Sequence, residues 1–173
     1  MTTIYYTACS LDGFIADPDH SLSWLFRQDI DPDGPMSYGG FRAAIGALAL
    51  GASTYQFVLG EPGGWEYTLP TWVFTHRDFP AQEGVTFTTD DVRSVHAAMT
   101  EAAAGQDLWV MGGGDLVGQF ADAGLLDEVW VQYAPVTLGG GAPLLPRRLD
   151  LRLEEQARNR DFLCARYTVS GPF

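Results

Sequence analysis

Short apolar runs along the chain predict β-strands, and amphipathic segments between them predict helices. The strand-like runs are rich in β-branched and aromatic residues and end at glycine, proline or polar residues. Up to Gly124 the two kinds of segment alternate, which is typical of a parallel sheet with crossover helices. In this part we expect strands at Thr3–Cys9, Ala47–Leu50, Trp72–Thr75, Val85–Thr88 and Leu108–Met111.

The clearest helix prediction lies between Val92 and about Ala104. Its apolar residues recur on one face with the period of about 3.6 residues that an α-helix requires. Asp90 or Asp91 precedes this pattern and is expected to cap the first turn. A further short helix is expected to end within Phe41–Gly46. Another is expected over Ser53–Leu59 with Ser53 as N-cap, and a third over Asp115–Ala123, ended by Gly124.

After Gly124 the pattern consists of strands alone. We expect these at Asp127–Tyr133, Leu151–Ala157 and Phe162–Val169, the last two as an antiparallel pair. Loops are expected at Ser10–Ser23, Gln28–Gly40 and Leu138–Leu145, and an irregular segment at Glu61–Pro70. Because 173 residues suit one domain, the pattern predicts a single α/β domain over residues 1–173 with a mixed, mostly parallel sheet.

Charge excludes several classes of partner. The net charge is −12, and all ten basic residues are arginine. Binding to nucleic acid or to an anionic membrane depends on many exposed cations, so we expect neither. An anionic small molecule is still compatible with this composition, since backbone N–H groups and one or two arginines can bind it in a pocket.

The two cysteines, Cys9 and Cys164, both lie in expected strands. They are interpreted as buried free thiols of a protein in a reducing compartment, and no Cys or His spacing suggests a metal site. The N-terminus lacks the basic and apolar regions of a signal peptide, and no run approaches the ~18 apolar residues of a membrane span. We therefore expect a cytoplasmic protein.

Three expected strands end in residues suited to bind phosphate. Gly112, Gly113 and Gly114 separate a strand from a helix, whose first turn carries unpaired N–H groups and a partial positive charge. The segments "LGASTY" (Leu50–Tyr55) and "VFTHRD" (Val73–Asp78) add hydroxyl groups and Arg77. Together they suit a long, multiply phosphorylated ligand such as a dinucleotide. Taken alone, the three glycines could equally form a tight turn.

Several motifs in order along the chain carry a resemblance to a known family. They are "YYTACSLDGFIAD" (Tyr5–Asp17), Trp24, "LGASTY", "VFTHR", "VMGGGDLVGQF" (Val110–Phe120) and "GLLDEVWVQYAPVTLGGGAPLL" (Gly124–Leu145). With them the chain resembles the dihydrofolate-reductase-like superfamily. It is most similar to the reductase domain of the bifunctional riboflavin-biosynthesis deaminase-reductase and its stand-alone relatives. The resemblance implies a three-layer α/β fold, with a mixed, mostly parallel sheet flanked by helices and closed by antiparallel strands.

The resemblance also implies bound NADPH and assigns residues to it by matching position. The pyrophosphate and nicotinamide side would be wrapped by Gly112, Gly113, Gly114, Asp115, Leu116 and Val117. The other phosphates would face Gly51, Ser53 and Thr54, and the adenosine 2′-phosphate would face Thr75, His76 and Arg77. Ala8 and Ile15 would line the nicotinamide. Ala52 stands where relatives commonly have a basic residue, so NADH is not excluded.

Two residues are candidates for the chemistry itself. Asp12 is the best acid of the family motif, although it could instead cap the turn before Gly13. Trp24 could pack on the substrate or belong to the core. On the substrate side, Arg27 and Arg42 are the available cations for a ribose phosphate. Four further basic residues are expected on solvated faces: His20, His96, Arg147 and Arg148.

The function that follows is an NAD(P)H-dependent reductase of a small heterocyclic or ribosylamino-pyrimidine-like molecule. It resembles the reductase that acts on 5-amino-6-(5-phosphoribosylamino)uracil. A pterin reductase is an alternative, because Asp29 follows Trp24 at the spacing of the pterin-binding carboxylate of dihydrofolate reductases. A nucleotide-binding module without turnover is another. As partners we expect a small-molecule substrate and a second copy of the chain in a homodimer.

Overall fold

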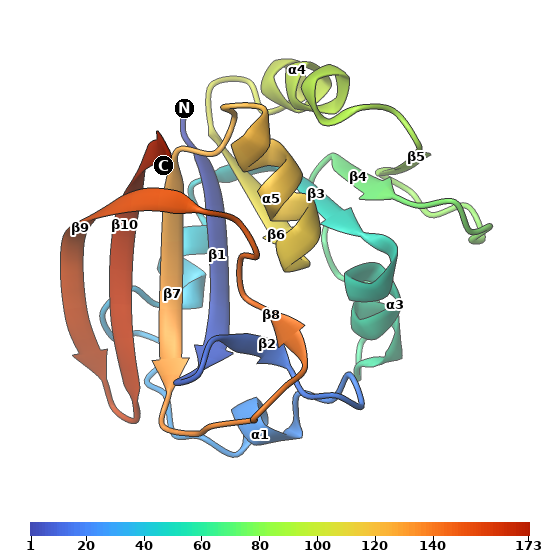
Figure 1. Ribbon diagram of the computed structural model, residues 1–173. Coiled ribbons are helices and arrows are strands. Elements are labelled where there is room, and N and C mark those ends of the chain that lie inside the picture. Colours follow the sequence, from blue (N-terminus) through green and yellow to red (C-terminus); the bar gives the residue numbers. More distant parts are fainter.

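Eight strands form one sheet in the order β5-β4-β3-β6-β1-β7-β10-β9 in the computed structural model, which describes residues 1–173 (Figure 1). From β5 to β7 every neighbouring pair is parallel, and β10 then runs antiparallel to both β7 and β9. This confirms the expected mixed sheet with closing antiparallel strands. The bounds are β1 Thr3–Ser10, β3 Ile45–Gly51, β4 Thr71–Phe74, β5 Val85–Thr88, β6 Asp107–Gly112, β7 Glu128–Ala134, β9 Leu149–Asn159 and β10 Phe162–Pro172.

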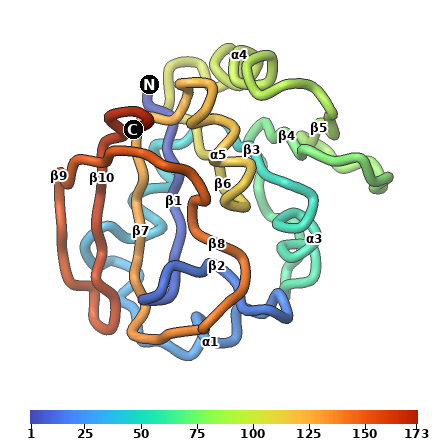
Figure 2. The backbone as a smooth tube through the Cα atoms, viewed as in Figure 1, coloured from blue at the N-terminus to red at the C-terminus, as the bar shows by residue number.

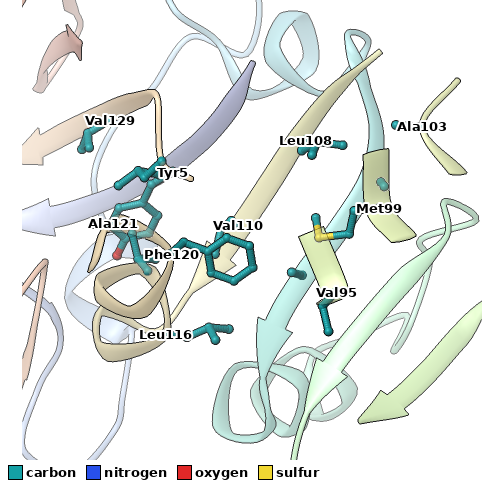
Figure 3. Packing of buried hydrophobic residues seen from close by; sticks show 14 of the residues in the cluster. Tyr5, Val95, Met99, Ala103, Leu108, Val110, Leu116, Phe120, Ala121 and Val129 are labelled. Atoms are coloured by element: carbon teal, nitrogen blue, oxygen red, sulfur yellow. The ribbon is translucent and has the colours of Figure 1, made fainter. Parts of the chain in front are cut away.

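Helices α4 (Val92–Ala102) and α5 (Gly114–Asp122) cover one face of this sheet. Met99 of α4 and Phe120 of α5 have no exposed surface, and they share a cluster with Val110 of β6 (Figure 3). Burying a large apolar side chain stabilises the fold by about 1.5–3 kcal/mol. The apolar faces predicted from the sequence are therefore the ones that hold these helices on the sheet.

The opposite face is packed with aromatic residues. Phe41 of α2 (Tyr38–Arg42) stacks on Tyr6 of β1, with ring centroids 4.3 Å apart, and lies edge-on to Trp109 of β6. Helix α3 (Ala52–Gly60) contributes Tyr55, which clusters with Leu50 and Val73. The sheet is thus the middle of three layers, as the resemblance implied.

Helix starts and ends test the capping predictions. Asp91 caps α4 by accepting hydrogen bonds from the N–H groups of Arg93 and Ser94, and Gly124 follows the end of α5 with φ +70°, so both predictions are confirmed. The prediction for Ser53 is wrong. Gly51 occupies the N-cap position of α3, and no side chain caps that helix.

Three short elements escaped prediction. Strands β2 (Phe14–Ala16) and β8 (Ala142–Pro143) pair antiparallel inside the two segments expected to be loops, and α1 (Ser23–Phe26) follows the first of them. Figure 2 traces the chain from the end of β1 into β2 and from β7 around into β8. Elements of two to four residues are too short to show a period, so only their tertiary pairing defines them. None of the helices combines the length and apolar character needed to cross a membrane.

Candidate functional site

The ends of β3 and β6 bring two helix starts to the same edge of the sheet. Gly51 ends β3 and Gly112 ends β6, and the parallel register pairs Leu50 with Gly112. A Cβ on Gly51 would lie 3.8 Å from the carbonyl oxygen of Gly112 and 4.0 Å from the nitrogen of Gly113. Helices α3 and α5 therefore begin side by side, at the carboxyl ends of parallel strands where α/β proteins bind ligands.

Both of these helices begin without a side-chain cap. The N-caps are Gly51 in α3 and Gly113 in α5, which have no side chain to accept a hydrogen bond from the first turn. In contrast, Asp91 caps α4 and Ser37 caps α2. The first-turn N–H groups of α3 and α5, with their partial positive charge, are therefore available to an anion.

The three glycines of the opening of α5 serve different purposes. Gly112 has φ +126°, a conformation that side chains disfavour. Gly114 lies under the backbone of the chain itself, because a Cβ there would collide with the carbonyl oxygens of Pro143 and Leu144. A Cβ on Gly113 would meet only Ile15 Cδ1, at 3.9 Å. Gly113 thus faces Ile15 of β2, and a Cβ there would fit at ordinary van der Waals distance.

The end of β4 provides the third group of polar residues. Thr75 Oγ1 accepts a hydrogen bond from the N–H of Arg77 at 2.8 Å. The guanidinium of Arg77 donates from Nη1 to Gln56 Oε1 of α3 at 3.1 Å. His76 and Arg77 are exposed. Since β4 neighbours β3, the structure places Thr75–Arg77 on the same edge as Gly51, as the sequence predicted for one long site.

The other residues assigned to the cofactor differ in how much of each side chain is exposed. Ala8 and Thr54 are half-buried, and Ser53 is exposed. Leu116 and Val117 are buried in the core, so only their backbone can reach a ligand. Asp115 is exposed, and its carboxylate accepts hydrogen bonds from Gln119 at 3.1 Å and from Arg147 at 3.2 Å.

The carboxylate of Asp12 is bonded to the loop between β7 and β8. It accepts hydrogen bonds from Ser10 Oγ at 2.6 Å, from the N–H of Leu138 at 3.0 Å and from the N–H of Gly139 at 2.7 Å. These donors lower the pKa of Asp12 to about 2. The N–H of Gly13 bonds to the carbonyl of Ser10, so the alternative role of Asp12, capping that turn, is not what the structure shows.

Trp24 lies in a small core cluster. It is 4% exposed and packs with Ala134, Phe162 and Cys164. Its indole N–H donates to the carbonyl of Ser21 at 3.2 Å. The side chain is therefore placed to join α1 to the ends of β7 and β10.

Asp29 faces away from the glycine turns. Its carboxylate pairs with Arg160 Nη1 at 2.7 Å, and its N–H bonds to the carboxylate of Asp161. These contacts attach it to the turn between β9 and β10. The carboxylate that the spacing suggested for pterin binding is thus engaged in an ion pair with Arg160.

Two side chains expected on solvated faces are only partly exposed and have defined partners. Arg147 lies across α5 beside Gly118 and pairs with Asp122 at 2.8 Å and Asp115 at 3.2 Å. His96 is half-buried and shares a hydrogen bond of 2.9 Å with Thr3 Oγ1, and desolvation lowers its pKa. In both cases the partner is distant in sequence, so no local pattern indicated the contact.

The other arginines considered also have defined places. Arg148 lies over the ring of Phe173, 4.9 Å from its centroid, and Arg42 lies at the same distance over Tyr67. Arg42 therefore packs on the aromatic face with α2, while Arg27 is exposed at the end of α1. No three His, Cys, Asp or Glu side chains gather where they could hold a metal ion.

Comparisons with known proteins show similarity in sequence and in fold. The chain is 34% identical over 157 residues to the uncharacterized protein YwjB of Bacillus subtilis (strain 168), covering 88% of each protein. A Shewanella sp. PV-4 protein whose name assigns it to riboflavin biosynthesis superposes with a TM-score of 0.84 at 24% identity, over 98% of this chain and 99% of that one. Dihydrofolate reductase from Enterococcus faecalis, complexed with NADP(H), gives a TM-score of 0.59 at 14% identity, over 98% and 96% of the two chains.

The two structural matches confirm the dihydrofolate-reductase-like fold. The sequence match extends beyond fold, because the family model described as the RibD C-terminal domain covers residues 66–160. This segment includes the end of β4, the glycine turn before α5 and the β7–β8 loop. The chain therefore belongs to the RibD C-terminal domain family of reductases.

Proposed function

We propose that this protein is an NADPH-dependent reductase that transfers a hydride to a small heterocyclic substrate. The observation that carries the proposal is the meeting of two uncapped helix starts, α3 and α5, with Arg77 on the same edge of the sheet. A dinucleotide phosphate has an anionic pyrophosphate for the helix starts and a separate 2′-phosphate for an arginine.

Each part of the cofactor has residues of matching chemistry. Gly51, Ser53 and Thr54 at the start of α3 and Gly112–Val117 at the start of α5 would hold the phosphates through backbone N–H and hydroxyl groups. Thr75, His76 and Arg77 would hold the 2′-phosphate. Ala8 and Ile15 would lie against the nicotinamide, which supplies the hydride when bound. The protein's own contribution is to orient the reactants and exclude water.

For the substrate we propose a ribosylamino-pyrimidine-like ring. The family supports this class. The exposed Arg27 is the remaining cation for a ribose phosphate, because Arg42 packs on Tyr67. The pairing of Asp29 with Arg160 leaves the pterin alternative without a carboxylate anchor. If the protein binds a dinucleotide but reduces no substrate, it is a nucleotide-binding module without turnover.

Replacing Arg77 with alanine is expected to weaken NADPH binding by roughly 10- to 100-fold, because a hydrogen bond to a charged group contributes about 1.5–3 kcal/mol. Binding of NADH, which lacks the 2′-phosphate, is expected to change little. Titration of the purified protein with each dinucleotide, followed by tryptophan fluorescence, measures both affinities.

Arg93→Ala is the matched control for this experiment. Arg93 is also exposed near a helix start, but Asp91 caps that helix. Its affinity for NADPH should equal that of the wild type. Failure of both dinucleotides to bind the wild-type protein would contradict the proposed function. Equal loss of NADPH and NADH affinity in Arg77→Ala would contradict the role given to that residue.

We also propose that two copies form a homodimer through the open face of β9 and β10. Leu151, Leu153 and Leu163 are 41%, 53% and 51% exposed, and no helix covers them. A cavity of about 250 Å³ is lined by Leu151 and in part by Tyr167 and Leu149. A second copy related by a two-fold axis would bring the same leucines into contact.

Leu153→Glu is expected to convert the dimer to a monomer, because a charge would be buried among apolar side chains at the interface. Light scattering after size-exclusion chromatography measures the mass. The control is Arg152→Ala, on the opposite side of β9, which should remain dimeric. A monomeric wild-type protein would disprove this assembly.

A further inference from the structure

The loop between β1 and β2 is bonded to the segment from the end of β7 to Leu144, which contains the β7–β8 loop and β8. The N–H of Leu11 donates to the carbonyl of Val136 at 2.7 Å, and the N–H of Leu144 donates to the carbonyl of Gly13 at 2.9 Å. The short strands β2 and β8 continue this pairing. Two segments more than a hundred residues apart therefore form one double loop at the carboxyl end of β1.

Asp12 supplies the side chain at the centre of this double loop. Its two carboxylate oxygens accept hydrogen bonds from the N–H groups of Leu138 and Gly139, while Ser10 Oγ donates to one of them. Ser10 Oγ in turn accepts from the N–H of Phe14 at 3.0 Å. The carboxylate thus satisfies backbone donors of the second loop that would otherwise require water.

The double loop also surrounds the start of α5. On one side, Ile15 follows Asp12 by three residues and faces Gly113. On the other side, the carbonyl groups of Pro143 and Leu144 lie on Gly114. The hydroxyl of Tyr5 donates to the Leu144 carbonyl at 3.1 Å and holds that side to β1. A shift of either loop would therefore move Ile15 or the first turn of α5.

We propose that Asp12 is a positioning residue for hydride transfer: its carboxylate joins the two loops into one wall that keeps Ile15 opposite Gly113. It does not supply the proton. The catalytic part of this inference rests on the proposed function, whereas the joining of the loops does not depend on it.

The ionisation state of Asp12 supports a positioning role and not a role as general acid. The pKa of Asp12 lies at about 2 because three donors stabilise the carboxylate, so the group is ionised at neutral pH. The neighbouring titratable group is Cys9, whose burial raises the thiol pKa to about 12 and keeps it neutral. The pKa of Asp12 is lower in the folded protein than its unfolded value of about 4, so ionised Asp12 stabilises the fold when the pH is above about 4. This contribution is lost as the pH falls toward 2. Between about pH 5 and 9 the wall should therefore not change.

Hydrogen exchange tests the joining of the loops in the protein without cofactor. In Asp12→Ala, the amides of Leu138 and Gly139 are expected to exchange at least about tenfold faster, because their acceptor is gone. In Asp12→Asn, the amide oxygen still accepts, so the increase should be smaller. The control is Asp19→Ala. Asp19 lies in the next turn, and its exposed carboxylate accepts no hydrogen bond. Unchanged exchange in Asp12→Ala would overturn the inference.

NADPH binding and its pH profile test the positioning role. We expect about tenfold weaker NADPH binding in Asp12→Ala and partial rescue in Asp12→Asn, with the affinity of both variants following the same pH profile as that of the wild type between about pH 5 and 9. A proton donor would behave differently, since its loss would reduce kcat with NADPH affinity intact. That result would overturn the assignment of Asp12 as a positioning residue. If the wild type binds no NADPH, the proposed function fails, and the exchange experiment still decides whether Asp12 joins the loops.

Discussion

Replacing Gly114 with alanine should destabilise the fold by about 3 kcal/mol, near the upper end for overpacking a core. The new Cβ would lie 2.5 Å from the carbonyl oxygen of Leu144, and the carbonyl oxygen of Pro143 would be closer still. These are backbone atoms, so they cannot rotate away as a side chain does. The Leu144 segment is further held by hydrogen bonds to Tyr5 and Gly13. Relief of the collision therefore requires the wall around α5 to separate.

Urea unfolding measures the loss of stability, and an NADPH titration of the folded variant measures the effect on the site. Gly39→Ala is the control, because a Cβ on Gly39 in helix α2 meets nothing within 4 Å. Alanine there should be neutral or stabilise the protein by up to about 1 kcal/mol. A Gly114→Ala protein as stable as wild type would show that the β8 segment is not held where the structure places it.

Replacing Trp24 with alanine should cost about 3–5 kcal/mol of stability, as is typical for the loss of a buried tryptophan. The ring is 4% exposed and fills the space among Ala134, Phe162 and Cys164. Its removal would leave a cavity between α1 and the ends of β7 and β10. Trp24→Phe should lose less, because it retains most of the apolar contact and loses the hydrogen bond to Ser21.

Thermal or urea unfolding of both variants measures these losses. Phe26→Ala is the matched control two residues away, since Phe26 is 62% exposed and has Phe57 as its aromatic neighbour. Its cost should be below about 1 kcal/mol. The alternative given by the sequence, that Trp24 packs on the substrate, has its own test in Trp24→Phe: a raised KM with nearly unchanged stability would support it. A small loss in Trp24→Ala would contradict the structural role.

The acidic surface and the local chemistry of the site are compatible. A net charge of −12 repels polyanions over a distance, but the cofactor phosphates would meet two helix starts and Arg77 at close range. Exposed charges separated by more than about 8–10 Å are largely screened at physiological salt. We therefore expect the local donors, not the overall charge, to determine anion binding.

The sequence by itself determined the fold class and the edge of the sheet that we propose as the site. Apolar periodicity identified the helix over Val92–Ala102 and most strands of the main sheet, because each of these patterns depends on residues a few positions apart. Two glycine turns and the polar end of a third expected strand identified the edge that we propose binds the phosphates. That step followed from a general rule, since the carboxyl ends of neighbouring parallel strands meet.

Only the tertiary structure decided which groups are free to act at that edge. In the sequence Asp12 is a candidate acid. In the structure its carboxylate is bonded to Leu138 and Gly139, 126 and 127 positions away. Asp29 and Arg147 likewise pair with distant residues. Gly114 is needed because a distant segment of the same chain lies on it. Such contacts join residues far apart in sequence and leave no period in it. The sequence therefore indicates where to look for the site, and the packing of its two loops supports the roles proposed for its residues.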